Sequence, residues 1–62
     1  MSIEAMIELI GEYAGEHPRF DDAVLISVAG KYERDGEITP AQEDALRNII
    51  SRFNMEDWKD SQ

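Results

Sequence analysis

Apolar residues recur at helical spacing in three stretches of the chain. In the first, they repeat on one face from Ile3 to Ala14, directly after Ser2, a residue type that often caps the start of a helix. Residues 22–35 and 40–53 show the same period, and no stretch alternates between apolar and polar residues. The pattern therefore predicts helices over about 3–14, 22–35 and 40–53, and no β-sheet.

Residues that favour turns separate these stretches. Gly15 offers a stop for the first helix, and Gly36 can take the left-handed conformation that ends the second. Thr39, Pro40 and Gln42 match the start of a helix, with Pro40 at the first helical position and the other two forming a capping box. The third helix is thus the most sharply defined at its start.

The segment after the third helix, residues 54–62, has room for one further turn at most, and its last residues are expected to fray. Trp58 is the exception, because its large indole would gain most by folding back onto the helices. We therefore expect an all-α fold in one domain, 1–62, built as a small three-helix bundle with a short C-terminal turn or tail.

Charge narrows the classes of partner. Fourteen acidic and six basic residues give a net charge of −8, which repels phosphate backbones and anionic lipid. Nucleic acid and membrane are therefore disfavoured, whereas a protein with a basic surface is favoured. No apolar run reaches the roughly 20 residues of a membrane span, and the N-terminal stretch lacks the bases of a signal peptide. We expect a cytoplasmic protein.

Residues for catalysis or metal binding are sparse. The chain has no cysteine, and His17, its one histidine, lies in a turn where we expect it to be solvated. The few hydroxyl side chains are scattered along the sequence without a neighbouring base. We therefore expect no catalytic residue, no metal and no cofactor, and a protein that is not an enzyme.

An acidic row marks the first helix. Glu4, Glu8, Glu12 and Glu16 recur every fourth residue, so they lie along one side of the helix. Like charges at this spacing cost a few tenths of a kcal/mol per pair, so a sequence shaped by stability alone would include lysines. The row is either a solvated face that keeps the chain soluble or a contact surface for a basic protein.

The second helix carries a second candidate surface. Ala23, Ile26 and Gly30 fall opposite its apolar side, and small residues around an isoleucine let another helix approach closely. We interpret these residues as a contact with a partner helix or with a second copy in a homodimer. Leu9, on the flank of the first helix, could extend this surface. The alternative is that Ile26 is exposed without a partner.

The junction between the second and third helices has two further interpretations. Residues 31–42 are similar to a calcium-binding EF-hand loop, with Gly36 at its turn position. Lys31 and Gln42, however, replace the acidic ligands at the first and last positions. A degenerate EF-hand-like structural protein therefore remains as one alternative.

A helix-turn-helix DNA-binding protein is the other alternative. Its reading helix would be the third, whose outward positions include Arg47 and Asn48. Glu43 and Asp44 occupy the turn that would meet the phosphates first, and Glu43 can pair with Arg47 at helical spacing. The sign of the charge argues against this function.

Residues 28–53 also resemble a known kind of segment. Their sequence, "VAGKYERDGEITPAQEDALRNIISRF", resembles a short helical segment of proteins encoded by bacteriophages. The residues that carry the resemblance are Tyr32, Gly36, Ile38, Thr39, Gln42 and Leu46. In phage proteins such segments often accompany replication or repair factors. The resemblance implies a small phage accessory protein, located in the host cell, that modulates a nucleic-acid-processing enzyme by contact.

Overall fold

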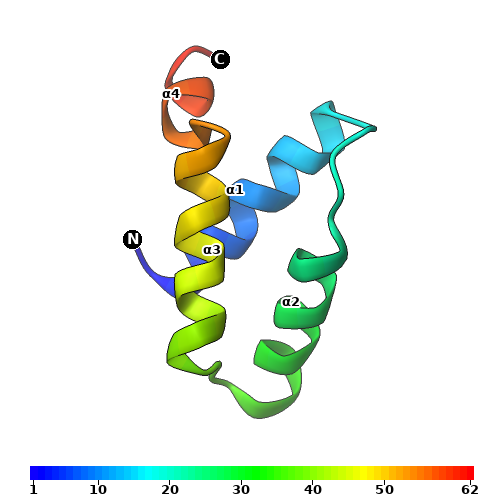
Figure 1. Cartoon of the computed structure of the whole chain (residues 1–62), viewed down its shortest axis with the longest axis vertical. Coiled ribbons are helices and arrows are strands. Elements are labelled where there is room, and N and C mark those ends of the chain that lie inside the picture. The colour runs from blue at the N-terminus through cyan, green and yellow to red at the C-terminus, as the bar shows by residue number, and fades with distance from the viewer.

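The computed structural model describes residues 1–62 and consists of four helices joined by short turns (Figure 1). They are α1 (Ile3–Glu16), α2 (Ala23–Asp35), α3 (Pro40–Arg52) and α4 (Met55–Asp60). The chain contains no strand, so the predicted all-α class is confirmed, and the three predicted helices are present. None of the four is long and apolar enough to cross a membrane.

Three of the predicted helix boundaries rest on specific caps. The Ser2 hydroxyl accepts a hydrogen bond from the backbone N–H of Ala5 at the start of α1. Thr39 and Gln42 exchange the two hydrogen bonds of a capping box at the start of α3. Gly36 ends α2 with a φ of 74°, the left-handed conformation that glycine adopts at little cost. These three predictions are confirmed.

The predicted end of α1 at Gly15 is wrong, because the helix continues to Glu16. The backbone N–H of His17 bonds to the carbonyl oxygen of Ala14, and the His17 ring is hydrogen-bonded to the carbonyl oxygen of Tyr13. These bonds occupy carbonyl groups that a helix end would otherwise leave unpaired. The cap is therefore His17, and Gly15 is an ordinary helical residue.

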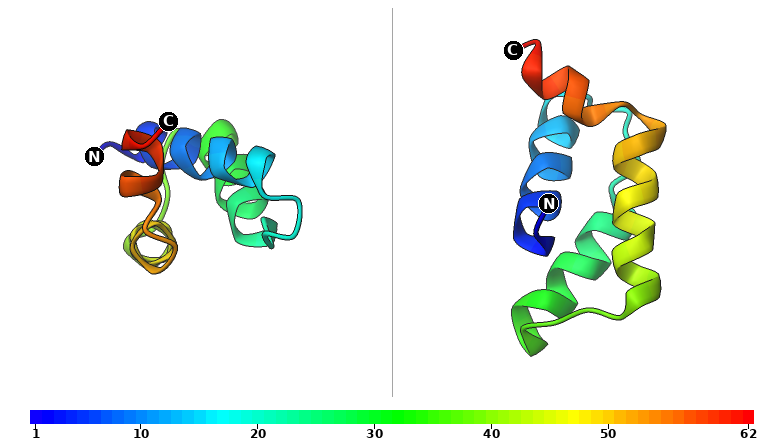
Figure 2. Two further views of the ribbon diagram at one scale, coloured as in Figure 1. Left: turned by 90° about the horizontal axis from the view of Figure 1, so that it is seen from above. Right: turned by 90° about the vertical axis from the view of Figure 1, so that its left-hand side faces the viewer.

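The helices are arranged around α1. It contacts each of the other three helices, and α3 contacts both α2 and α4. By contrast, α2 and α4 do not contact each other, and they lie on opposite sides of the molecule in every view (Figures 1 and 2). Surfaces on α2 and on α4 can therefore be occupied at the same time.

The core consists of seven buried apolar side chains. They come from all four helices: Met6, Leu9, Ile10, Val28, Leu46, Ile50 and Met55. Met55 is 0% exposed, and the segment expected to form one turn at most contains α4, a six-residue helix that completes the core. Phe53, in contrast, is 42% exposed, because it stands at the C-cap of α3, just beyond the buried residues Leu46 and Ile50.

Candidate functional site

The acidic row of α1 is divided by contacts within the fold. Glu4 accepts a hydrogen bond of 2.8 Å from the Tyr32 hydroxyl of α2, and Glu12 accepts one of 2.5 Å from the Lys59 ammonium of α4. Glu8 and Glu16 have no hydrogen-bond or ion-pair partner in the chain. Two carboxylates of the row thus link α1 to neighbouring helices, while the other two remain free for solvent or a partner.

A groove runs between α1 and α4 beside the acidic row, with a volume of about 310 Å³. We call it the α1/α4 groove, and its lining residues are Met1, Ala5, Glu8, Leu9, Glu12, Glu56, Lys59 and Asp60. Three of these are apolar and the rest are charged. The volume is at the lower end of the ~300–1,000 Å³ of ligand pockets, which suits one or two side chains of a partner.

Leu9 belongs to this groove and not to the surface of α2 that it was expected to extend. Its side chain is only 7% exposed, because α4 covers the flank of α1 on which it lies. With Met1 and Ala5 it provides the apolar part of the groove lining. The expectation of a patch shared between Leu9 and α2 is therefore wrong.

Carboxylates dominate the charge of the α1/α4 groove. Glu8 and Glu12 are one helical turn apart on α1, and Glu56 and Asp60 are one turn apart on α4. The only cation is Lys59. Its hydrogen bond to Glu12, with the charges of Glu12 and Glu8, raises the pKa of the ammonium above its ordinary value. The groove therefore favours a positively charged side chain.

The second candidate surface lies on α2. Ile26 is 64% exposed and Ala23 is also exposed, as expected for the outward side of this helix. A Cβ placed on Gly30 would meet only Arg34, whose Nη1 would lie 3.8 Å away. The backbone of α2 can thus be approached closely at Gly30.

An apolar groove of about 390 Å³ borders this surface, between α2 and α3. Its lining residues are Ala23, Val24, Ser27, Val28, Ala41, Gln42 and Ala45. Val24 is more than one-third exposed at the rim of this groove, so the apolar character of α2 extends beyond Ile26.

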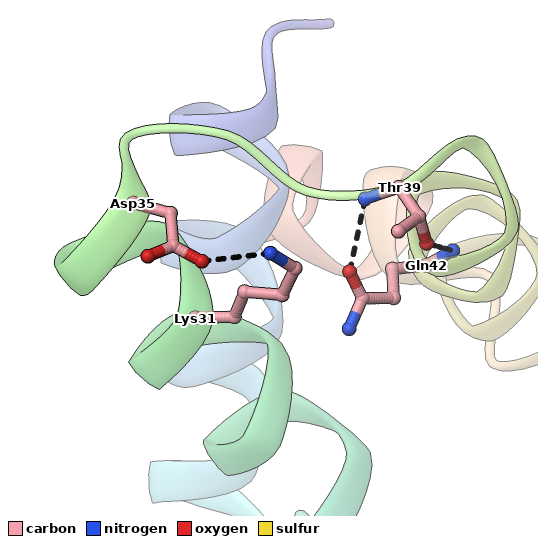
Figure 3. A network of polar contacts seen from close by, with 4 residues as sticks. All are labelled: Lys31, Asp35, Thr39 and Gln42. Atoms are coloured by element: carbon pink, nitrogen blue, oxygen red, sulfur yellow. Dashed lines mark hydrogen bonds and ion pairs between the residues drawn. The ribbon is translucent and has the colours of Figure 1, made fainter.

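The polar residues of the α2–α3 junction are engaged in local pairs (Figure 3). Lys31 donates a hydrogen bond of 2.8 Å to Asp35, and this contact, with the charge of Lys31, lowers the pKa of the Asp35 carboxyl. Gln42, at the last position of the EF-hand-like loop, caps α3. No group of three or more His, Cys, Asp or Glu side chains is gathered closely enough to hold a metal ion.

The exposed cation of α3 is paired on its own helix. Arg47 forms ion pairs with both Glu43 and Asp44, the second at 3.5 Å, so the predicted pairing with Glu43 is confirmed. Two carboxylates therefore screen the side chain that a DNA-reading helix would need most. This geometry does not favour the helix-turn-helix alternative.

Sequence patterns did not indicate the aromatic cluster that covers one end of the core. Tyr13 lies at its centre, with ring centroids 5.5 Å from Phe20, 5.8 Å from Phe53 and 5.1 Å from Trp58. Trp58 folds back onto the helices as expected. His17 stacks on Tyr13 at 3.8 Å and is not the solvated loop residue that was expected. The available signal was the helical i,i+4 spacing of Tyr13 and His17.

Comparison with known proteins found no matching family model, no similar curated protein and no similar solved structure. The function of the chain is therefore inferred from its own surfaces. Of these, the α1/α4 groove has the most specific chemistry, because an apolar lining, four carboxylates and one bound ammonium lie together there.

Proposed function

We propose that the chain is a small acidic protein-binding module, which acts by contact and not by catalysis. In this proposal the α1/α4 groove binds a basic segment of another protein. The observation that carries the proposal is the position of Lys59, whose ammonium is held by Glu12 and attracted by Glu8. The chain's own lysine thus illustrates how a partner's lysine or arginine would be held.

The lining of the groove suits such side chains. Lysine and arginine carry apolar stems below their charged ends, and the stems gain by covering apolar surface. Met1 and Ala5 offer that surface, while Glu8, Glu56 and Asp60 have no ion-pair partner in the chain. A partner segment with two basic side chains about one helical turn apart would place a cation near α1 and another near α4.

Long-range charge supports the same class of partner. A net charge of −8 attracts basic proteins and speeds their association, and complementary charges set specificity more than affinity. Basic surfaces of this kind are typical of proteins that bind nucleic acid. With the resemblance of residues 28–53 to phage segments, this leads us to propose a phage accessory protein that modulates a nucleic-acid-processing enzyme.

Fluorescence anisotropy with a labelled helical peptide tests the proposal. The peptide should carry lysines one turn apart beside leucines, and the control peptide should carry glutamates in place of the lysines. We expect the lysine peptide to bind and the affinity to fall about tenfold or more in Glu8→Lys, which reverses a charge in the groove.

Glu33→Lys is the matched control for this variant, since it makes the same change in net charge on the exposed side of α2. It should retain most of the affinity. Equal losses in both variants would show that only net charge matters. Binding of a random DNA duplex at low salt, with no binding of the lysine peptide, would favour the DNA-binding alternative instead.

A further inference from the structure

One row of residues on α2 has a chemical order that is complementary to itself. Asp22, Ile26, Gly30 and Arg34 recur every fourth residue and form one ridge on the helix surface. We call them the α2 row. In chain order it presents an acid, a large apolar side chain, a gap and a base.

We propose that two copies of the chain pair through this row in antiparallel orientation. Reversing one copy places Ile26 against Gly30 of the other, and Asp22 against Arg34. By two-fold symmetry, each of these contacts occurs twice. The isoleucine of each copy would then fill the space that the glycine of the other leaves.

All four residues of the α2 row reach the surface: Ile26 and Arg34 are exposed, and Asp22 and Gly30 are half-buried. Ile26 is 64% exposed, and the only atom near a Cβ placed on Gly30 belongs to the flexible end of Arg34. Arg34 makes no ion pair in the chain, and the Asp22 side chain makes no capping hydrogen bond although it stands at the helix start. Both charges of the row thus lack a strong partner in the monomer.

Charge complementarity favours a second copy over a different protein as the occupant. One acid and one base make the α2 row neutral, so no like charges are opposed at the contact itself, although each copy carries a net charge of −8. The order of the charges also specifies the antiparallel orientation, because a parallel pair would oppose like charges.

The position of α2 adds support. It contributes only Val28 to the fully buried core, and the apolar groove beside Val24 adjoins the row. Since α2 and α4 do not touch, pairing through α2 leaves the α1/α4 groove open in both copies. The proposal is therefore independent of the proposed function.

A single pair of helices covers less surface than the ~1,200 Å² or more of a stable complex, so we expect a dissociation constant of roughly 10–100 μM. Sedimentation equilibrium of the full chain across this range should show a reversible monomer–dimer mixture. A chain that stays monomeric well above this range would overturn the proposal.

A charge exchange tests the orientation. Asp22→Lys and Arg34→Glu each place like charges opposite one another at both ends of the pair. The dissociation constant of the dimer should therefore rise about tenfold or more in each variant alone. When the two variants are mixed, every opposed pair becomes attractive, and the mixture should recover the wild-type association. Far-UV circular dichroism of each variant confirms that its helices are intact.

A mixture that associates no better than the separate variants would contradict the antiparallel pairing. A further variant, Ile26→Ala, removes the apolar contact. It leaves the charge unchanged, and alanine favours the helix at least as well as isoleucine. It should also weaken the dimer about tenfold, and unchanged association would equally overturn the proposal.

Discussion

The ammonium of Lys59 lies 2.5 Å from a carboxylate oxygen of Glu12, 47 residues earlier in the chain. This contact joins α4 to α1 and places one cation inside a groove that otherwise carries only acidic charge. It also means that part of the acidic row is already occupied. A basic partner therefore competes with Lys59 for Glu12.

The competition predicts the effect of Lys59→Gln. The substitution frees Glu12 and removes the only cation of the α1/α4 groove, so the lysine peptide should bind severalfold more tightly. The control is Lys31→Gln, which changes the net charge equally but frees Asp35 at the far end of α2. Anisotropy titrations of both variants check this. An equal gain in the control would mean that the groove has no special role.

Met55→Ala tests whether α4 is part of the core. Met55 is fully buried, so its truncation should lower the free energy of unfolding by about 2–4 kcal/mol, a large share of the stability of so small a domain. The volume-conserving Met55→Leu should cost less than about 1.5 kcal/mol. Urea denaturation followed by circular dichroism measures both. A small loss on truncation would indicate that α4 is detached in solution.

Alanine substitutions at two glycines should change the stability of the fold in opposite directions. Gly36 has a φ of 74°, so Gly36→Ala should cost about 1 kcal/mol of stability. Gly15 lies within α1 with open space around it, so Gly15→Ala should add about 0.5–1 kcal/mol through higher helix propensity. Thermal unfolding of the pair measures the difference. Stabilisation by both would show that Gly36 does not adopt the left-handed conformation.

Alkaline pH should loosen the contacts of α1. The hydrogen bond to Glu4 raises the pKa of Tyr32 above its ordinary value of 10.0, and the bond to Glu12 raises that of Lys59 above 10.5. Both groups are thus more easily protonated in the folded chain than in the unfolded one. Their contribution to stability is complete below about pH 10 and is lost as the pH rises through the raised values.

The melting temperature should therefore fall above about pH 10, and more steeply in the wild type than in Tyr32→Phe, which lacks the hydroxyl bonded to Glu4. A melting series against pH for both proteins measures this. The same slope in the two would mean that the bond between Tyr32 and Glu4 is not formed in solution.

Local patterns predicted most of the helices because their boundaries depend on neighbouring residues. Ser2, Gly36 and the capping box of Thr39 and Gln42 act within a few residues, and each was identified from the sequence. The predicted end of α1 was wrong because His17 caps the helix one residue beyond Glu16. This cap requires the His17 ring to turn back onto Tyr13.

Contacts between distant residues could not be predicted in this way. The residues after Asn54 are few and mostly polar, and the contact that holds them against the core, the burial of Met55, depends on residues far away in the sequence. The acidic row was visible from its spacing, but the α1/α4 groove was not, because three of its eight lining residues come from α4. The outward position of Ile26 was predictable because it depends on the periodicity of α2 alone.

The central claim is that the α1/α4 groove binds a basic segment, and amide chemical-shift mapping of the labelled chain with the lysine peptide tests it most directly. We predict saturable shifts at Glu8, Leu9, Glu56 and Asp60, the residues that line the groove, and little change at Ile26 of α2. Shifts centred on α2, or spread uniformly over the acidic surface without saturation, would contradict the claim.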